Sequence, residues 1–133
     1  MIFKGALMSD DLDRRRSKIR ERQLLLALEQ WAPGYQQVAG GWLGYVCDIT
    51  EATAEEKTWL EQHVAKNGMP DATAREWHEV RRTQGREANA AATAAFLAGD
   101  YERAHDLIDD ARAYGALFET EWQQLHEFIA AQR

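Results

Sequence analysis

The sequence contains one cysteine and two prolines, and its only serines are Ser9 and Ser17. Cys47 alone cannot form an internal disulfide, so the fold is not a disulfide-stabilised scaffold. No Gly-x-Ser-x-Gly motif surrounds either serine, which argues against a serine hydrolase of that type. No apolar run approaches the roughly 18 residues of a membrane span. We therefore expect a cytoplasmic protein that does not associate with membranes.

Length, composition and charge are those of one globular domain over residues 1–133. The hydrophobic fraction is 45%, the charged fraction is 29% and the net charge is −6. A chain of this length can bury a core without metal or disulfide support. An acidic molecule repels the phosphate backbone of nucleic acid unless basic residues are segregated on one face.

The pattern predicts a mainly α fold, a compact bundle of about five helices with one small β-hairpin. A first helix is expected over residues 10–31, the hairpin over 35–49 and the remaining helices over 53–131. Residues 1–9 are interpreted as an extension, because Met8 precedes Ser9, a suitable helix cap. The hairpin is predicted because β-favouring residues lie on both sides of Gly40 and Gly41.

Helix boundaries carry clear capping signals. Thr53 with Glu56, and Thr73 with Glu76, each have the spacing of a capping box. Asp100 is suited to begin the following helix. Short connections between the last three helices predict antiparallel neighbours.

The stretch "AAFLAGDYERAHDLIDDARAYG" is similar to one helical hairpin of the tetratricopeptide type, with a small-residue helix, a Gly-Asp-Tyr turn and Ala104 at the packing position. No second copy follows at the period of 34 residues, whereas repeat folds need about three units. We therefore interpret it as a single tight helical hairpin.

The first helix is basic at its front and apolar at its back. Six basic residues fall between residues 14 and 22, but four acidic residues lie among them in the segment 10–22. The resulting excess of two positive charges is weak for DNA binding. Leu24 to Leu28 cover nearly the whole circumference, so the back half is predicted to be buried and the front half to project into solvent. A protein-contact surface and a nucleic-acid arm are the alternative roles for the front half.

Four histidines fall one to a predicted helix, which raises the question of a metal site. By helical angle, His63 lies on an apolar face, whereas His78, His105 and His126 lie off or at the edge of theirs. No His-Glu-x-x-His pair occurs. We expect His63 to pack in the core, the others to lie at the surface, and no metal or cofactor to be bound.

Aromatic residues flank the Pro-Gly break and the expected hairpin turn. Exposed aromatic and arginine side chains are preferred at protein interfaces. The candidate partner-binding residues are Arg15, Arg16, Arg20, Trp31, Tyr35, Trp42 and Tyr45. The alternative is that the aromatic members cover an open end of the bundle.

The sequence thus favours a small, non-enzymatic interaction or regulatory protein that binds a protein partner through the hairpin and the first helix. No catalytic residue is assigned, and the oligomeric state is left open. One alternative is a nucleic-acid-associated regulator that uses the basic first helix. Another is a small helical-bundle enzyme or ligand-binding protein.

Overall fold

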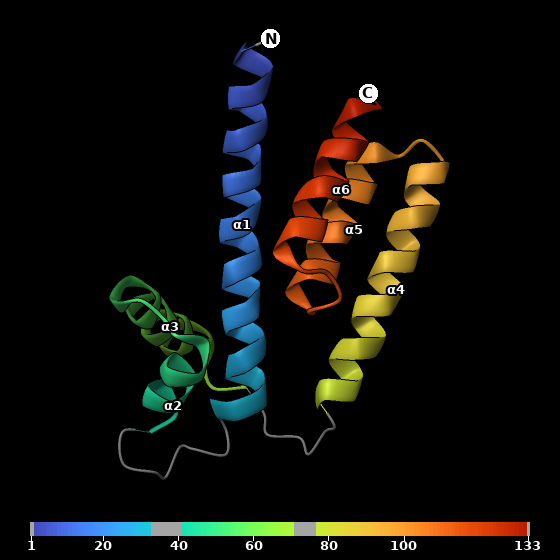
Figure 1. Cartoon of the computed structure of the whole chain (residues 1–133). Coiled ribbons are helices and arrows are strands. Elements are labelled where there is room, and N and C mark those ends of the chain that lie inside the picture. The colour runs from blue at the N-terminus through green and yellow to red at the C-terminus, as the bar shows by residue number, and fades with distance from the viewer. Residues whose placement is uncertain (1, 33–40, 71–76, 133) are drawn as a thin grey trace. The chain divides into compact units, whose positions relative to one another are not determined.

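The computed structural model describes residues 2–32, 41–70 and 77–132, which form six helices and no strand (Figure 1). The helices are α1 (Ile2–Trp31), α2 (Gly41–Thr50), α3 (Ala54–Asn67), α4 (Trp77–Leu97), α5 (Tyr101–Ala113) and α6 (Glu119–Ala131). The expected mainly α fold is confirmed. Within the described ranges, no helix is both long and apolar enough to cross a membrane.

The predicted β-hairpin over residues 35–49 is wrong where the structure describes it, and a sixth helix takes its place. Residues 41–50 form α2, and residues 35–40 lie outside the described ranges. Val46 of this helix is fully buried against a core that includes Leu24 and Leu60. The β-favouring composition was therefore a poor guide, because tertiary packing of an apolar helical face outweighs intrinsic strand preference.

Two of the predicted helix caps are present. At α3, Thr53 Oγ1 accepts a hydrogen bond from the Glu56 N–H (3.1 Å), and the Glu56 carboxylate accepts one from the Thr53 N–H (2.9 Å). At α5, Asp100 Oδ1 accepts one from the Arg103 N–H (3.2 Å). The other predicted capping box, Thr73 with Glu76, lies outside the described residues. Side chains at these ends satisfy N–H groups that have no partner within the helix.

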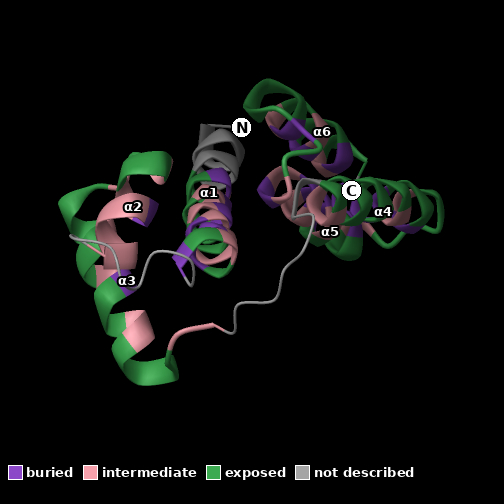
Figure 2. Ribbon diagram, turned by 90° about the horizontal axis from the view of Figure 1, so that it is seen from below, coloured by how far each residue is buried: buried purple, intermediate pink, exposed green. Residues whose placement is uncertain are grey.

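The chain divides into two compact units. Unit 1 comprises residues 1–20 and 76–133, and unit 2 comprises residues 21–75. Helix α1 therefore contributes its residues up to Arg20 to one unit and its residues from Glu21 onward to the other. Figure 2 maps the burial of the described residues onto the helices.

In unit 1, α5 packs against both α4 and α6. The core is rich in small residues, since Ala88, Ala92 and Ala95 of α4 are buried together with Ala104 and Ala111 of α5. Small side chains allow the backbones of neighbouring helices to approach closely. The connections 98–100 and 114–118 are short. Helix α5 therefore runs antiparallel to α4, and α6 runs antiparallel to α5.

At Gly85, α4 lies close to the connection from α5 to α6. A Cβ atom added at Gly85 would lie 2.8 Å from the Ala116 Cβ and 3.4 Å from the Tyr114 Cβ. Helix α4 continues through this position without interruption. The glycine therefore serves close packing, and any larger residue would force the α5–α6 connection outward.

Unit 2 has a separate core. Its buried residues are Leu24, Ala27, Leu28, Ala32, Val46 and Leu60. The prediction that the leucine-rich back half of the first helix packs in a core is confirmed by Leu24 and Leu28, each 1% exposed. Partly buried Trp42, Leu43 and Trp59 pack against the outside of this cluster.

Candidate functional site

The front half of α1 packs against α5, within the same unit, through an arginine. Leu12, Arg15 and Ile19 are all buried and recur at helical spacing, so they form one face of the helix. Arg15 Nη1 donates to Asp109 Oδ2 (2.6 Å) and to Asp106 Oδ1 (3.1 Å) on α5, while Arg15 Nε donates to Asp11 Oδ2 (3.1 Å). The charge of Arg15 is thus neutralised by carboxylates of its own fold.

Asp109 is the centre of this buried network. Its Oδ1 accepts hydrogen bonds from the Trp122 Nε1–H (2.8 Å) and the His126 Nε2–H (2.7 Å), while its Oδ2 accepts from Arg15. Burial by itself raises the pKa of Asp109, but the hydrogen bonds from His126, Trp122 and Arg15 together outweigh it and hold the pKa below its ordinary value. Asp109 therefore stays ionised and joins α1, α5 and α6.

His105 and His126 extend the network into the interior. His126 is fully buried, His105 is 5% exposed, and their Nδ1 atoms are 2.6 Å apart. The ring centroids are 4.7 Å apart and the planes differ by 6°. With the nitrogens so close, the rings meet edge to edge through a hydrogen bond and not face to face. When His126 is neutral with its proton on Nε2, its Nδ1 accepts from the Nδ1–H of His105.

This pair corrects the prediction from the sequence. His105 and His126 were expected at the surface, but both are buried in unit 1. His63, expected in the core, is partly exposed and lies beside Trp59 with ring centroids 5.6 Å apart. The side chain of His78 lies outside the described residues. Burial is possible for both rings because Asp109 accepts a hydrogen bond from His126 Nε2–H, and His105 and His126 share a hydrogen bond between their Nδ1 atoms.

Arg16 is held on the surface of unit 1. Its Nε donates to Glu119 Oε1 (2.5 Å), its Nη1 to Asp13 Oδ1 (2.9 Å) and its Nη2 to Gln123 Oε1 (3.1 Å). The guanidinium also lies 5.2 Å from the centre of the Trp122 ring. The hydrogen bond that Arg16 donates to Glu119 is the largest cause of the raised pKa of Arg16. Arg16 is therefore committed to contacts within the chain.

A different surface lies at the end of α1 and on α2, within unit 2. Trp31 is 36% exposed and meets Tyr45 edge-on, with ring centroids 5.9 Å apart and an interplanar angle of 63°. Ile49 follows Tyr45 by one helical turn and is 43% exposed. We call the surface formed by Trp31, Tyr45 and Ile49 the α2 surface. It is an apolar, partly aromatic surface open to solvent.

The neighbours of the α2 surface anchor it to the core. Trp42 and Cys47 are partly buried and pack against the buried cluster that contains Val46. Burial raises the pKa of the Cys47 thiol, so the thiol stays protonated at neutral pH and is a poor nucleophile.

The structure separates the seven residues singled out in the sequence. Trp31 and Tyr45 are in direct contact, and Trp42 lies on the same helix as Tyr45. Arg15 and Arg16 belong to the network of unit 1. Arg20 is partly buried at the end of the α1 segment in unit 1 and has an interaction partner. Tyr35 lies outside the described residues.

Comparisons with protein-family models, with curated proteins and with solved structures found no match for this chain. Among the described residues, no cluster of three or more histidine, cysteine or carboxylate side chains has the arrangement of a metal site.

Proposed function

We propose that this protein is a non-enzymatic interaction protein whose α2 surface binds an apolar segment of a protein partner. The observation that carries the proposal is the incomplete burial of α2. This helix of ten residues contains one charged residue, Asp48, yet Val46 is its only fully buried residue. An apolar helix normally has a larger buried face, because burial of that face is what stabilises a short helix.

The composition of the α2 surface supports the same role. Tryptophan and tyrosine are enriched among the interface residues that contribute most to affinity. Trp31 and Tyr45 already hold each other in an edge contact, so little side-chain freedom is lost when a partner covers them. The predicted hairpin has no part in this proposal, since α2 occupies its described residues.

The contacts of α1 weigh against the nucleic-acid alternative. Arg14, Arg15 and Arg16 each form an ion pair with a carboxylate of the same chain. A phosphate would have to displace these carboxylates, so the gain from counterion release is reduced. The front half of α1 is better suited to hold unit 1 together than to bind a polyanion.

Affinity capture with quantitative mass spectrometry tests the proposal. The bait proteins are the unchanged chain, Ile49→Lys and the matched control Leu97→Lys. Leu97 is 78% exposed, and both positions lie at or next to the last residue of a helix. We expect Ile49→Lys to reduce recovery of a specific partner by at least about tenfold, because a charge is buried against an apolar segment.

The control decides the interpretation. Leu97→Lys should leave recovery within about twofold, since surface substitutions away from an interface have small effects. A partner lost equally with both variants, or retained by Ile49→Lys, contradicts the assignment of the α2 surface.

A further inference from the structure

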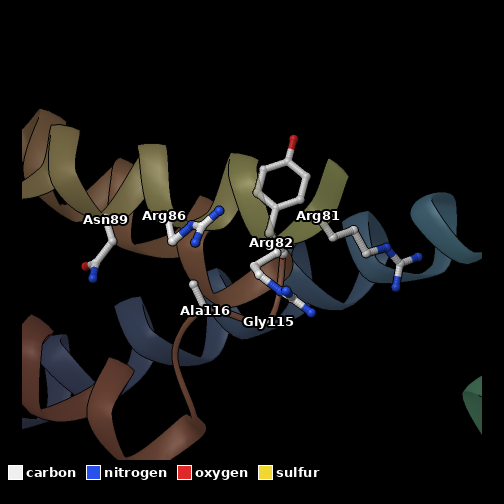
Figure 3. Close-up of a pocket in the computed structure, with 7 residues that line it drawn as sticks. Arg81, Arg82, Arg86, Asn89, Gly115 and Ala116 are labelled. Atoms are coloured by element: carbon white, nitrogen blue, oxygen red, sulfur yellow. The ribbon is translucent and has the colours of Figure 1, made fainter. Parts of the chain in front are cut away.

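The first half of α4 contains a group of arginines that neither the sequence interpretation nor the proposed function uses. Arg81, Arg82 and Arg86 line an open pocket of about 410 Å³ in unit 1. The other lining residues are Asn89 of α4 and Tyr114, Gly115 and Ala116 of the α5–α6 connection. Figure 3 shows Arg82 and Arg86 beside this connection, whereas Arg81 extends away from them.

The pocket has a fixed wall. Because Gly85 allows the α5–α6 connection to approach α4 closely, Ala116 lies directly against the helix between Arg82 and Arg86. Arg82 and Arg86 are four residues apart and therefore share one face of α4. Asn89 continues this face by nearly one more turn. Two guanidinium groups and an amide are thus presented along one side of the same pocket.

These arginines differ from those of α1 in how they are neutralised. Arg82 Nη1 is 3.2 Å from Glu79 Oε1, but the two side chains are 60% and 47% exposed, so the pair is weak and easily exchanged. Arg86 forms no ion pair or hydrogen bond within the part of the chain that the structure describes. The pocket therefore has positive charge available to a ligand, although the whole chain carries −6.

We propose that this pocket binds a small phosphorylated molecule, with its phosphate on Arg82 and Arg86. Guanidinium groups match phosphate oxygens through paired hydrogen bonds. The volume lies in the range of about 300 to 1,000 Å³ typical of small-molecule sites. A long polyanion is disfavoured, because the acidic remainder of the molecule repels it. Asn89 supplies a donor and an acceptor for hydroxyl groups on the rest of the molecule.

This proposal is independent of the α2 surface, and inorganic pyrophosphate is the probe that tests it. The titration is followed by calorimetry on the full chain at physiological salt, with Arg86→Gln and the matched variant Arg103→Gln. Arg103 is exposed on α5, outside the pocket, and its replacement removes the same charge. We expect saturable binding with a Kd of about 1 mM or tighter, weakened about tenfold by Arg86→Gln and unchanged by Arg103→Gln.

Three results would overturn the site. The first is an absence of saturable pyrophosphate binding. The second is an equal loss of affinity in the two variants, which indicates a diffuse response to net charge. The third is that a tetraglutamate peptide or an oligonucleotide binds at Arg86 more tightly than pyrophosphate does. That result would show that the pocket prefers carboxylates or a longer polyanion. Thermal melts of both variants verify folding, and neither exposed arginine should shift the midpoint by more than a few degrees.

Discussion

Arg15 in unit 1 is 9% exposed, whereas Ile49 in unit 2 is 43% exposed, the reverse of what the chemistry of each side chain favours. The arginine is buried because three carboxylates surround its guanidinium. The isoleucine lies in solvent because the described residues of unit 2 leave that face of α2 uncovered. The network around Asp109 therefore satisfies buried polar groups within unit 1, whereas the α2 surface of unit 2 leaves apolar side chains exposed.

The largest effect is expected from breaking the ion pair of unit 1. Arg15→Met leaves Asp109 charged and largely buried without its cation, and loss of one partner of a buried pair costs about 3 to 5 kcal/mol. Urea unfolding followed by circular dichroism measures this loss. Arg14→Met is the control, because Arg14 is 63% exposed and its pair with Asp11 contributes little. Equal stability of the two variants would show that the network is dispensable.

Two glycine substitutions compare the packing of the units directly. Gly85→Ala places a methyl group 2.8 Å from the Ala116 Cβ and should destabilise unit 1 by about 1 to 3 kcal/mol. Gly44→Ala in α2 meets nothing within 4 Å and should stabilise the helix by up to about 1 kcal/mol. Thermal unfolding should show a lower melting midpoint for Gly85→Ala and a higher melting midpoint for Gly44→Ala than for the unchanged chain. A stabilising Gly85→Ala would contradict the close approach of α4 to the α5–α6 connection.

Acid should lower the stability of unit 1, because Asp109 becomes protonated. Its pKa in the folded chain lies below the ordinary 3.8, so its stabilising contribution is complete at pH values above 3.8 and is lost as the pH falls through the folded pKa. Asp11, whose pKa is also lowered, adds in the same direction. Denaturant unfolding between neutral pH and about pH 3 should show this loss, and Asp109→Asn should flatten the profile. If Asp109→Asn leaves the pH dependence of the unfolding free energy unchanged, groups other than Asp109 cause the acid sensitivity.

The smallest effect on stability belongs to the α2 surface. Ile49→Lys should change the free energy of unfolding by less than about 1 kcal/mol, because the side chain is already in solvent and leaves no cavity. Chemical denaturation with tryptophan fluorescence is the measurement. A loss of several kcal/mol would instead place Ile49 in a core and remove the reason for proposing a binding surface.

Local signals in the sequence predicted much of the helical organisation. The capping box at Thr53 and the cap at Asp100 depend on residues within one turn, and both are present. Ala104, placed at the packing position of the helical hairpin, is buried on α5 together with Ile108 and Ala111. These features follow from spacing along a single helix, so no knowledge of the tertiary fold was needed.

The network and α2 depended on distant contacts and were not predictable in the same way. Arg15 lies 94 residues from Asp109 in the sequence. Without knowledge of that carboxylate, an arginine on a helical face indicates that the face is exposed, because arginine is seldom buried unless it is paired. His126 was missed for the same reason, since its partner Asp109 is on another helix. For residues 41–50, composition favoured strand, whereas packing of Val46, Trp42 and Leu43 on the core of unit 2 favours helix.

Photo-crosslinking from two positions in living cells tests the contrast between the units most directly. A benzophenone side chain is introduced at Ile49 on the α2 surface or at Lys18, an exposed residue of the basic half of α1. We expect a discrete adduct with one protein from position 49 and none from position 18, because Arg15 and Arg16 of α1 pair with carboxylates of unit 1. An adduct from position 18 with none from position 49 would contradict it.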